Sequence, residues 1–199
     1  MRVVVTGASG LLGNALVRAA REREHEVCAL ERSVLDVTDS VAVERRIRDE
    51  KPCVILHCAG YTAVDQAEEE PEKAMTINCD GTRNVALAAA QIGAAVFYPS
   101  TDYVFDGQSS RPYYPSDPTA PINAYGVSKL AGEQVLSSSG CDWTVVRTSW
   151  LYGSGGKDFV DGILDGRSNS DTMRIVDDQI GCPTWTGSLA PGIIALAEV

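Results

Sequence analysis

The N-terminal residues combine an apolar strand with a glycine-rich turn. Residues 2–6 read Arg-Val-Val-Val-Thr, and Gly7, Gly10 and Gly13 follow where the next helix is expected to begin. Glycines at such a junction allow a tight turn, close approach of the backbone to a pyrophosphate, and close packing of the helix on the strand. The N–H groups and the positive end of the helix favour phosphate. This feature predicts a nucleotide-binding strand–turn–helix unit, and a purely structural turn is the alternative.

Strand-like and helix-like segments alternate along the chain. The expected strands are residues 2–6, 26–30, 53–58, 95–99 and 143–148, with a further one near 172–176. The expected helices are residues 11–23, 40–50, 72–92 and 124–138, with others near 157–166 and 187–198. Such alternation is typical of a parallel sheet with helices on both faces. The predicted fold class is therefore α/β, a Rossmann-like doubly wound parallel sheet. Segment 101–123 carries four prolines, and an irregular loop of that length is expected to be functional.

The composition argues against several functional classes. The 199 residues carry a formal net charge of −10, and acidic residues flank both clusters of arginines, which argues against nucleic-acid binding. Six cysteines without a Cys-x-x-Cys pair, and only two histidines, argue against a metal site. No secretory signal or membrane-spanning run is expected, so the predicted setting is the cytoplasm, with no membrane partner.

Tyr125 and Lys129 are spaced for contact on one face of an expected helix. An ammonium group beside a phenol favours the phenolate and lowers the tyrosine pKa from its usual value near 10. A phenol adjusted in this way can transfer a proton to or from a substrate oxygen. The alternative is a tyrosine and a lysine on a solvated helix face.

Charged residues follow the second expected strand. Glu31 is suited to accept hydrogen bonds from an adenosine ribose, and Arg32 is suited to receive a 2′-phosphate. Because both are present, NADH and NADPH stay open as alternatives. Asp36 and Asp39 are candidates for capping the next helix, and capping is the preferred interpretation for Asp39.

Several motifs resemble one family within the extended short-chain dehydrogenase/reductase superfamily. The glycine turn has the Gly-x-x-Gly-x-x-Gly spacing of that superfamily. The matching segments are 59–65 (AGYTAVD), 100–107 (STDYVFDG), 123–133 (NAYGVSKLAGE), 147–153 (RTSWLYG) and 177–184 (DDQIGCPT). Together they resemble the dTDP-4-dehydrorhamnose reductase family. Segment 100–107 is the most discriminating, because epimerases and dehydratases of the superfamily usually carry a different motif there.

The resemblance implies an activity and a site. The family uses NADPH or NADH to reduce the C4 ketone of dTDP-4-dehydrorhamnose, which gives dTDP-L-rhamnose, and no metal is needed. The implied catalytic residues are Tyr125 as proton donor, Lys129 as its partner, which also holds the nicotinamide ribose, and Thr101 as a hydrogen-bonding group for the same substrate oxygen. The implied cofactor-binding residues are Gly7, Ser9, Gly10, Leu11, Leu12, Gly13, Glu31, Arg32, Asp36, Val37, Ala59, Gly60, Tyr61, Tyr125 and Lys129. The implied substrate-binding residues are Thr62, Asp102, Tyr103 and Trp150.

The resemblance also implies a division of the chain. Residues 1–149 would form the NAD(P)-binding domain. Residues 150–199 would form part of a substrate-binding lobe and a returning C-terminal helix, and this small lobe is expected to be truncated. The implied partner is a nucleotide sugar, and a homodimer is left open.

Some alternatives remain at this level. The function could be that of another nucleotide-sugar epimerase or reductase, or of a non-catalytic NADP-binding regulatory subunit resembling that of methionine adenosyltransferase. Asn78 would position the active site or serve only helix packing, and Trp150 would face the sugar or be only a core or lid aromatic. Asp158 departs from the family, which usually has asparagine there.

Overall fold

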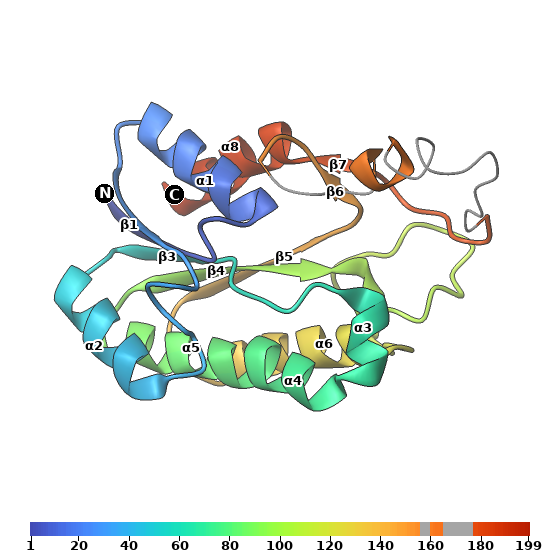
Figure 1. Cartoon of the computed structure of the whole chain (residues 1–199), viewed down its shortest axis with the longest axis horizontal. Helices are drawn as coiled ribbons and strands as arrows, with labels where there is room; N and C mark the ends of the chain where they lie inside the picture. The colour runs from blue at the N-terminus through green and yellow to red at the C-terminus, as the bar shows by residue number, and fades with distance from the viewer. Residues whose placement is uncertain (156–159, 165–176) are drawn as a thin grey trace.

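A computed structural model of the chain describes residues 1–155, 160–164 and 177–199 (Figure 1). Residues 160–164 are helical, as expected, but both ends of the helix expected near 157–166 lie outside the described residues. The strand expected near 172–176 and the unusual Asp158 also lie outside them.

Five parallel strands form the central sheet of the described part of the chain. They are β1 (Arg2–Thr6), β2 (Glu26–Leu30), β3 (Val54–His57), β4 (Ala95–Thr101) and β5 (Trp143–Thr148), in the order β2-β1-β3-β4-β5. All five match expected strands, and β4 continues two residues beyond its expected end, to Thr101. The strand order reverses direction between β1 and β3. In open parallel sheets, ligands bind outside the carboxyl ends of the strands at such a point.

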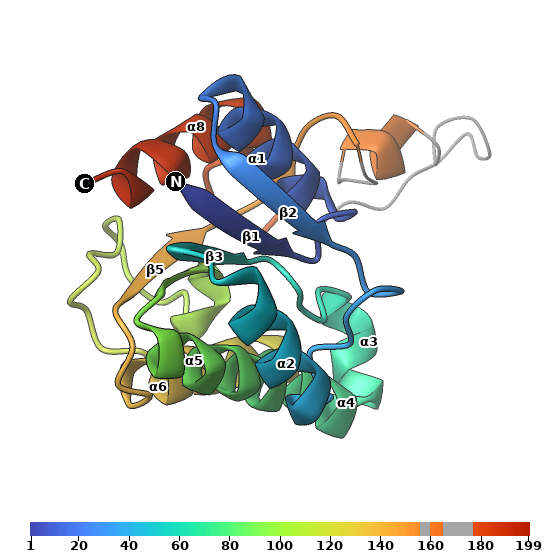
Figure 2. The same ribbon diagram turned by 90° about the vertical axis from the view of Figure 1, so that its left-hand side faces the viewer.

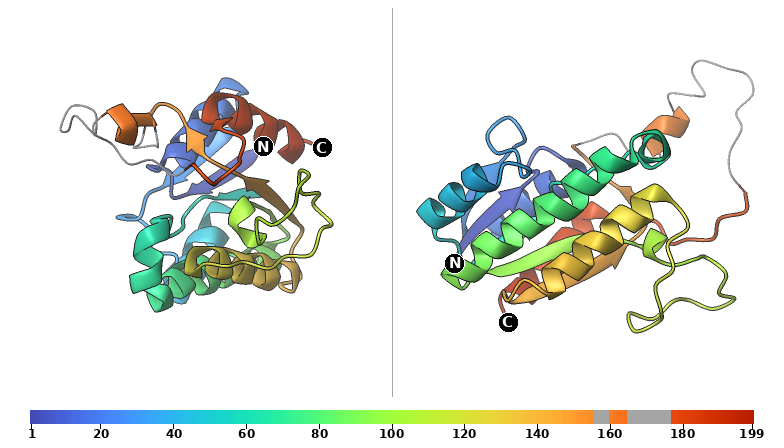
Figure 3. Two further views of the ribbon diagram at one scale, coloured as in Figure 1. Left: turned by 90° about the vertical axis from the view of Figure 1, so that its right-hand side faces the viewer. Right: turned by 90° about the horizontal axis from the view of Figure 1, so that it is seen from below.

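Helices cover both faces of the sheet, which confirms the doubly wound prediction. Figures 1 and 2 show α1 (Leu11–Glu22) and α8 (Thr186–Ala197) on one face, and α2 (Ser40–Glu50), α5 (Gly81–Ile92) and α6 (Ala124–Ser137) on the other. Figure 3 shows α5 and α6 side by side beneath the sheet.

The alternation of side chains along β1 explains why both faces are covered. Successive strand residues point to opposite faces of a sheet. Val3 and Val5 pack in one buried cluster with Leu16 of α1 and Ile194 of α8. Val4 packs in the other cluster with residues of α2 and α6, such as Ile47 and Leu136. An apolar run without a polar face therefore requires helices on both sides.

The helix expected over 72–92 is more complex than its sequence pattern predicts. It consists of α4 (Pro71–Met75), a π-helical turn at Thr76–Asp80, and α5. A short helix, α3 (Val64–Glu69), precedes α4 and was not predicted. The wider turn shifts the helical periodicity by a residue, which a search for a constant period does not detect. Such turns are frequent at functional sites, and this one carries Asn78.

A pair of very short parallel strands follows β5. These are β6 (Leu151–Tyr152) and β7 (Thr184–Trp185), and neither was predicted, because two residues carry no recognisable alternation. The chain then enters α8, which packs against α1. The carboxylate of Glu198, just after α8, accepts from Arg23 and His25 at 2.7 and 2.9 Å and fastens this end to the residues after α1.

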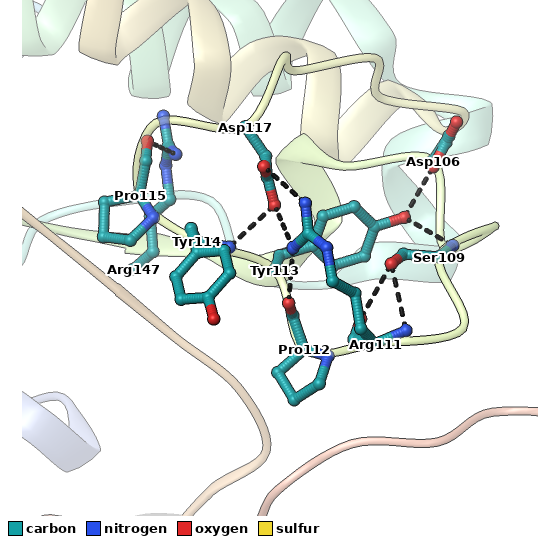
Figure 4. Close-up of polar contacts among 9 residues, drawn as sticks. All are labelled: Asp106, Ser109, Arg111, Pro112, Tyr113, Tyr114, Pro115, Asp117 and Arg147. Carbon is teal, nitrogen blue, oxygen red and sulfur yellow. Dashed lines mark hydrogen bonds and ion pairs between the residues drawn. The ribbon is translucent and has the colours of Figure 1, made fainter.

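The long segment between β4 and α6 is held by its own polar contacts (Figure 4). Both oxygens of the Asp117 carboxylate accept from the guanidinium of Arg111, at 2.8 and 2.9 Å, and one also accepts from the backbone N–H of Tyr114. The Arg111 bonds lower the pKa of Asp117 to about 2. Arg147 of β5 donates to the carbonyl oxygen of Pro115 at 3.1 Å. The irregular segment is thus tied to the sheet.

Candidate active site

A cavity of about 940 Å³ lies at the carboxyl ends of the strands. It brings together all but one of the residues that the sequence assigned to a site. These are Gly7, Ser9, Gly10, Leu11, Leu12, Gly13, Arg32, Asp36, Val37, Ala59, Gly60, Tyr61, Thr62, Thr101, Asp102, Tyr103, Tyr125, Lys129 and Trp150. The exception is Glu31, which is exposed and does not line the cavity. Its carbonyl oxygen accepts from the backbone N–H groups of Val34 and Leu35 at 2.9 Å.

The glycine turn fits tightly against the backbone that follows β3. Gly7 has φ +63°, in the left-handed region, and a Cβ added there would lie 2.6 Å from the backbone nitrogen of Ala59. A Cβ on Gly13 would collide with the carbonyl of Gly7. Both the structural and the phosphate-binding interpretation of these glycines therefore have a physical basis. At Gly7, Gly10 and Gly13 themselves, only backbone lines the cavity.

Asp36 and Asp39 have different roles. Asp39 is the N-cap of α2, and its side chain accepts from the N–H of Ala42 at 3.0 Å, which confirms the prediction for this residue. Asp36 lines the cavity, and its Oδ1 accepts from the backbone N–H and the hydroxyl of Thr38 at 2.9 and 2.8 Å. These bonds lower the pKa of Asp36, so its carboxylate is charged and fixed in place.

Asn78 joins three elements around the cavity. Its side chain is fully buried and forms two hydrogen bonds with the backbone of Tyr61: Oδ1 accepts from the N–H at 2.8 Å, and Nδ2 donates to the carbonyl at 3.0 Å. Nδ2 also donates to the hydroxyl of Ser128 in α6 at 2.9 Å. The sequence left open whether Asn78 positions the active site or serves only helix packing. These bonds support a role in positioning the backbone that lines the cavity, in addition to helix packing.

Tyr125 and Lys129 both lie buried on the cavity-lining face of α6. The Asn123 side chain caps this helix by accepting from the N–H of Gly126 at 2.7 Å. Burial raises the pKa of Tyr125 to about 12 and lowers the pKa of Lys129 to about 7. The expectation that the pKa of Tyr125 lies below its usual value near 10 is therefore wrong, because burial raises it. Desolvation dominates both groups, and the amine is directed toward the carbonyl oxygen of Pro99.

The residues at the end of β4 form a connected polar group. The Thr101 hydroxyl donates to Asp102 Oδ1 at 3.0 Å, accepts from the backbone N–H of Tyr103 at 3.2 Å, and interacts with the Tyr125 hydroxyl. Burial raises the pKa of Asp102. The ring of Tyr103 meets that of Tyr125 edge-on, with centroids 6.0 Å apart. The Thr101 hydroxyl at the end of β4 and the Tyr125 hydroxyl of α6 together are suited to bind a polarised oxygen atom.

Glu133, one helical turn beyond Lys129, anchors the same strand end. Its carboxylate accepts from the Ser100 hydroxyl at 2.5 Å and from Arg147 through two hydrogen bonds of 3.0 and 2.7 Å. A paired carboxylate of this kind is well satisfied despite its burial. Glu133 thus fixes the residue that precedes Thr101.

Trp150 lies on the cavity wall. Its φ of +47° is unusual for a bulky residue, its side chain is 37% exposed, and its carbonyl oxygen accepts from the N–H of Thr184 at 3.1 Å. A Cβ on Gly181 would lie 3.0 Å from the Trp150 ring, so the ring rests on this glycine. Trp150 is therefore not a core residue, and its place on the cavity wall fits both a sugar-facing and a lid position.

Sequence reasoning missed further lining residues. These are Leu35, Thr38, Cys58, Val64, Lys73, Thr76, Ile77, Pro99, Ser100, Thr148, Ser149 and Leu151. The rule that ligands bind at the carboxyl ends of parallel strands could have indicated Cys58, Ser100 and Thr148. No signal marked Lys73 and Thr76, which face the cavity because of the π-helical turn and its flanking helices. Within the described residues, no group of His, Cys, Asp and Glu could hold a metal ion, and no helix is long and apolar enough to cross a membrane.

The fold and the site together define a Rossmann-like protein of the short-chain dehydrogenase/reductase type. A family model described as "RmlD substrate binding domain" matches residues 1–199. The chain belongs to the dTDP-4-dehydrorhamnose reductase family.

Curated relatives and solved structures agree with this membership. The dTDP-4-dehydrorhamnose reductase of Streptomyces griseus is 45% identical over 98% of this chain and 64% of its own length. The spore coat polysaccharide biosynthesis protein SpsK of Bacillus subtilis (strain 168) is 40% identical over 98% of this chain and 69% of its own length. The crystal structure of dTDP-4-dehydrorhamnose reductase from Bacillus anthracis str. Ames in complex with NADP superposes with a TM-score of 0.95, at 40% identity, over 100% of this chain and 70% of that chain. The chain thus spans about two thirds of the length of these relatives.

Proposed function

We propose that the chain catalyses reduction of the C4 ketone of a dTDP-linked 4-keto-6-deoxysugar, dTDP-4-dehydrorhamnose, to dTDP-L-rhamnose with NADPH or NADH. The observation that carries the proposal is the continuous cavity that runs from the glycine turn at Gly7 to the buried cluster of Thr101, Tyr125 and Lys129. A dinucleotide whose pyrophosphate bound at the glycine turn would place its nicotinamide near this buried cluster. The names of the relatives support the same activity.

The residues around the glycine turn fit a dinucleotide. The space that a Cβ would fill at Gly7 and Gly13 is occupied by neighbouring backbone, so only glycine fits at these two positions. The backbone N–H groups of the turn and of the first residues of α1 are the candidates for binding phosphate. These groups would hold the pyrophosphate, and Asp36 with Val37 would contact the adenine. Arg32 lines the cavity and would receive a 2′-phosphate, whereas Glu31, the residue proposed to bind the ribose, lies outside the cavity lining. Ala59, Gly60 and Tyr61 would form the wall of the nicotinamide half.

The buried hydroxyl groups would complete the reduction. NAD(P)H, when bound, supplies the hydride to the ketone carbon. Tyr125, whose pKa of about 12 keeps it protonated near neutral pH, would donate its proton to the ketone oxygen and recover one from solvent. Lys129 would hold the nicotinamide ribose and stabilise the tyrosinate that forms. Thr101 would hydrogen-bond the same oxygen atom by turning its hydroxyl proton from Asp102 Oδ1 toward the substrate.

The remaining assignments concern the sugar and the assembly. Thr62, Asp102, Tyr103 and Trp150 would contact the sugar, since all four line the cavity beyond the glycine turn. Residues 1–149 would act as the cofactor-binding domain, and 150–199 would contribute to the substrate-binding lobe. A homodimer and a cytoplasmic setting also belong to the proposal. Sedimentation at several protein concentrations tests the first, and fractionation of the source cells tests the second.

A direct assay tests the activity. The purified chain is mixed with dTDP-4-dehydrorhamnose and either NADPH or NADH, and loss of reduced nicotinamide is followed together with chromatography of the sugar nucleotide. We expect stoichiometric oxidation of the cofactor and formation of dTDP-L-rhamnose. Cofactor binding without oxidation of either cofactor would contradict the reductase assignment and favour a non-catalytic nucleotide-binding role. Epimerised sugar without net oxidation would favour an epimerase.

A further inference from the structure

His57 is a buried titratable residue that the proposed reaction does not use. It ends β3, is 1% exposed, and stacks on the ring of Tyr98 with centroids 5.7 Å apart. Burial, with a smaller effect of Lys129, lowers the pKa of His57 to about 3. The ring is therefore neutral at neutral pH and carries a single N–H. It does not line the cavity, although Cys58 and Ala59 after it do.

The hydrogen bonds around the ring have only one consistent direction. The Thr82 hydroxyl donates to the carbonyl oxygen of Asn78 at 2.6 Å, and a carbonyl can only accept. The single proton of Thr82 is thus used, so its oxygen must accept from His57 Nε2, 3.2 Å away. With the proton on Nε2, Nδ1 must accept, and the Thr6 hydroxyl, 2.7 Å away, is the donor. The oxygen of Thr6 then accepts from the N–H of Ala59 at 3.3 Å.

Both ends of this chain of hydrogen bonds hold the same cavity wall. At one end, Thr6 binds the N–H of Ala59. At the other end lies Asn78, whose side chain binds the N–H and the carbonyl of Tyr61 at 2.8 and 3.0 Å. Segment 59–61 is thus held at its first residue by Thr6 and at its last by Asn78, and His57 links the two through its bonds to Thr6 and Thr82.

The position of this wall also affects the glycine turn. The backbone nitrogen of Ala59 lies where a Cβ on Gly7 would come within 2.6 Å, so the two segments are in close contact. A displacement of residues 59–61 would therefore change the space available at the glycine turn as well. Small displacements of positioning groups strongly affect binding and catalysis.

We infer that His57 is a positioning residue. As the neutral Nε2–H tautomer, it joins Thr6 to Thr82 and so fixes residues 59–61, the wall that would face the nicotinamide. The identification of the ligand as a nicotinamide rests on the proposed function, whereas the hydrogen bonds of His57 do not depend on it.

The first experiment measures the tautomer in the ligand-free chain. A long-range ¹H–¹⁵N NMR spectrum separates the two imidazole nitrogens, and His25, the other of the two histidines, supplies a reference signal. We expect His57 to show the neutral Nε2–H pattern, without titration between about pH 5 and 8. A neutral Nδ1–H pattern or a protonated ring at neutral pH would overturn the inference, whether or not the chain binds a dinucleotide.

The second experiment separates positioning from packing with two variants of Thr82. Thr82→Val removes the hydroxyl but keeps the shape, and Thr82→Ser keeps the hydroxyl. We expect Thr82→Val to accelerate amide hydrogen exchange at Ala59 and Tyr61 about tenfold and to raise the Kd for NADPH by a similar factor. The kcat at saturating cofactor should change much less, and Thr82→Ser should restore both values.

The amide of Val4, in the centre of the sheet, is the internal control, because its exchange reports the stability of the whole fold. Unchanged exchange at Ala59 and Tyr61 in Thr82→Val, or no recovery in Thr82→Ser, would contradict the inference. If the wild-type chain bound neither NADPH nor NADH, the proposed function would fail, while the exchange rates would still decide the role of His57. If Thr82→Val did not fold, the tautomer of the wild-type chain would decide it.

Discussion

The side-chain amine of Lys129 donates a 2.7 Å hydrogen bond to the carbonyl oxygen of Pro99. This bond joins α6 to β4 two residues before Thr101, and it holds the amine 3.8 Å from the centre of the Tyr98 ring. The site is buried, and burial lowers the pKa of Lys129 to about 7. The charge of Lys129, on the same helix face as Tyr125, is therefore sensitive to pH near neutrality.

The lysine should make the stability of the fold depend on pH. In the unfolded chain its pKa returns toward 10.5, so between about pH 7 and 10.5 the unfolded state binds more protons than the folded state. The contribution of Lys129 to the free energy of unfolding of the wild type should therefore rise with pH across this window, with a slope of at most about 1.4 kcal/mol per pH unit. Buried thiols such as Cys58, whose pKa burial raises to about 12, oppose this rise above about pH 9. Lys129→Met should remove that rise and be the more stable protein at pH 7, although it should lose turnover.

Thermal unfolding measured from about pH 6 to 10 tests this expectation. This range includes the folded-state pKa of Lys129, about 7, and approaches its unfolded-state pKa of 10.5. Lys51→Met is the matched control, because Lys51 is exposed and its variant should follow the wild-type profile. If stability changed with pH in the same way in the wild type and in Lys129→Met, burial would not be destabilising the charged form of the amine.

Tyr125→Phe should separate chemistry from cofactor binding. Removing the proton donor should lower kcat by about 10²–10⁴-fold, whereas the Kd for NADPH should stay within about threefold of the wild type. Tyr103→Phe is the control, since its ring lies against that of Tyr125 but its hydroxyl is not the proposed donor. Steady-state kinetics with fluorescence titration of NADPH give both values. Comparable kcat for Tyr125→Phe and the wild type would exclude this proton donor.

Gly7→Ala and Gly93→Ala should differ although both glycines have positive φ. Gly93 has φ +69° with no atom near its missing Cβ, so its variant should lose only about 1 kcal/mol of unfolding free energy from backbone strain. Gly7→Ala adds a collision with the backbone of Ala59 and should cost more, and it should abolish dinucleotide binding. Denaturant unfolding and NADPH titration provide the comparison. Equal losses for the two variants would mean that the backbone contact at Gly7 is unimportant.

Asp36→Ala and Asp39→Ala should divide binding from stability. Asp39 caps α2, so its loss should lower the free energy of unfolding by about 1 kcal/mol without changing the Kd for NADPH. Asp36 lines the cavity, so Asp36→Ala should weaken NADPH binding several-fold. Equilibrium unfolding and cofactor titration of both variants test the division. A stability loss confined to Asp36→Ala would reverse the two assignments.

Much of the fold could be predicted from local patterns. The valines of β1 are buried on both faces of the sheet and therefore require helices on either side of it. The glycines after β1 mark a turn in which a Cβ at Gly7 or Gly13 would collide with backbone. The π-helical turn at Thr76–Asp80 and the strands β6 and β7 could not be predicted, since they arise from contacts between segments distant in sequence. Asn78, for example, is bonded to Tyr61 and to Ser128.

The sequence by itself determined the layered α/β fold, the glycine turn, and the spacing that places Tyr125 and Lys129 on one face of α6. Local periodicity and turn chemistry are enough for these, because they depend on residues close together in the chain. Only the tertiary structure decided the directions in which the pKa values of that pair move, the direction of the hydrogen bonds through His57, and the place of Trp150 on the cavity wall. Desolvation and long-range hydrogen bonding exist only after distant segments pack together, and here they reverse the direction in which spacing alone predicts the tyrosine pKa to move.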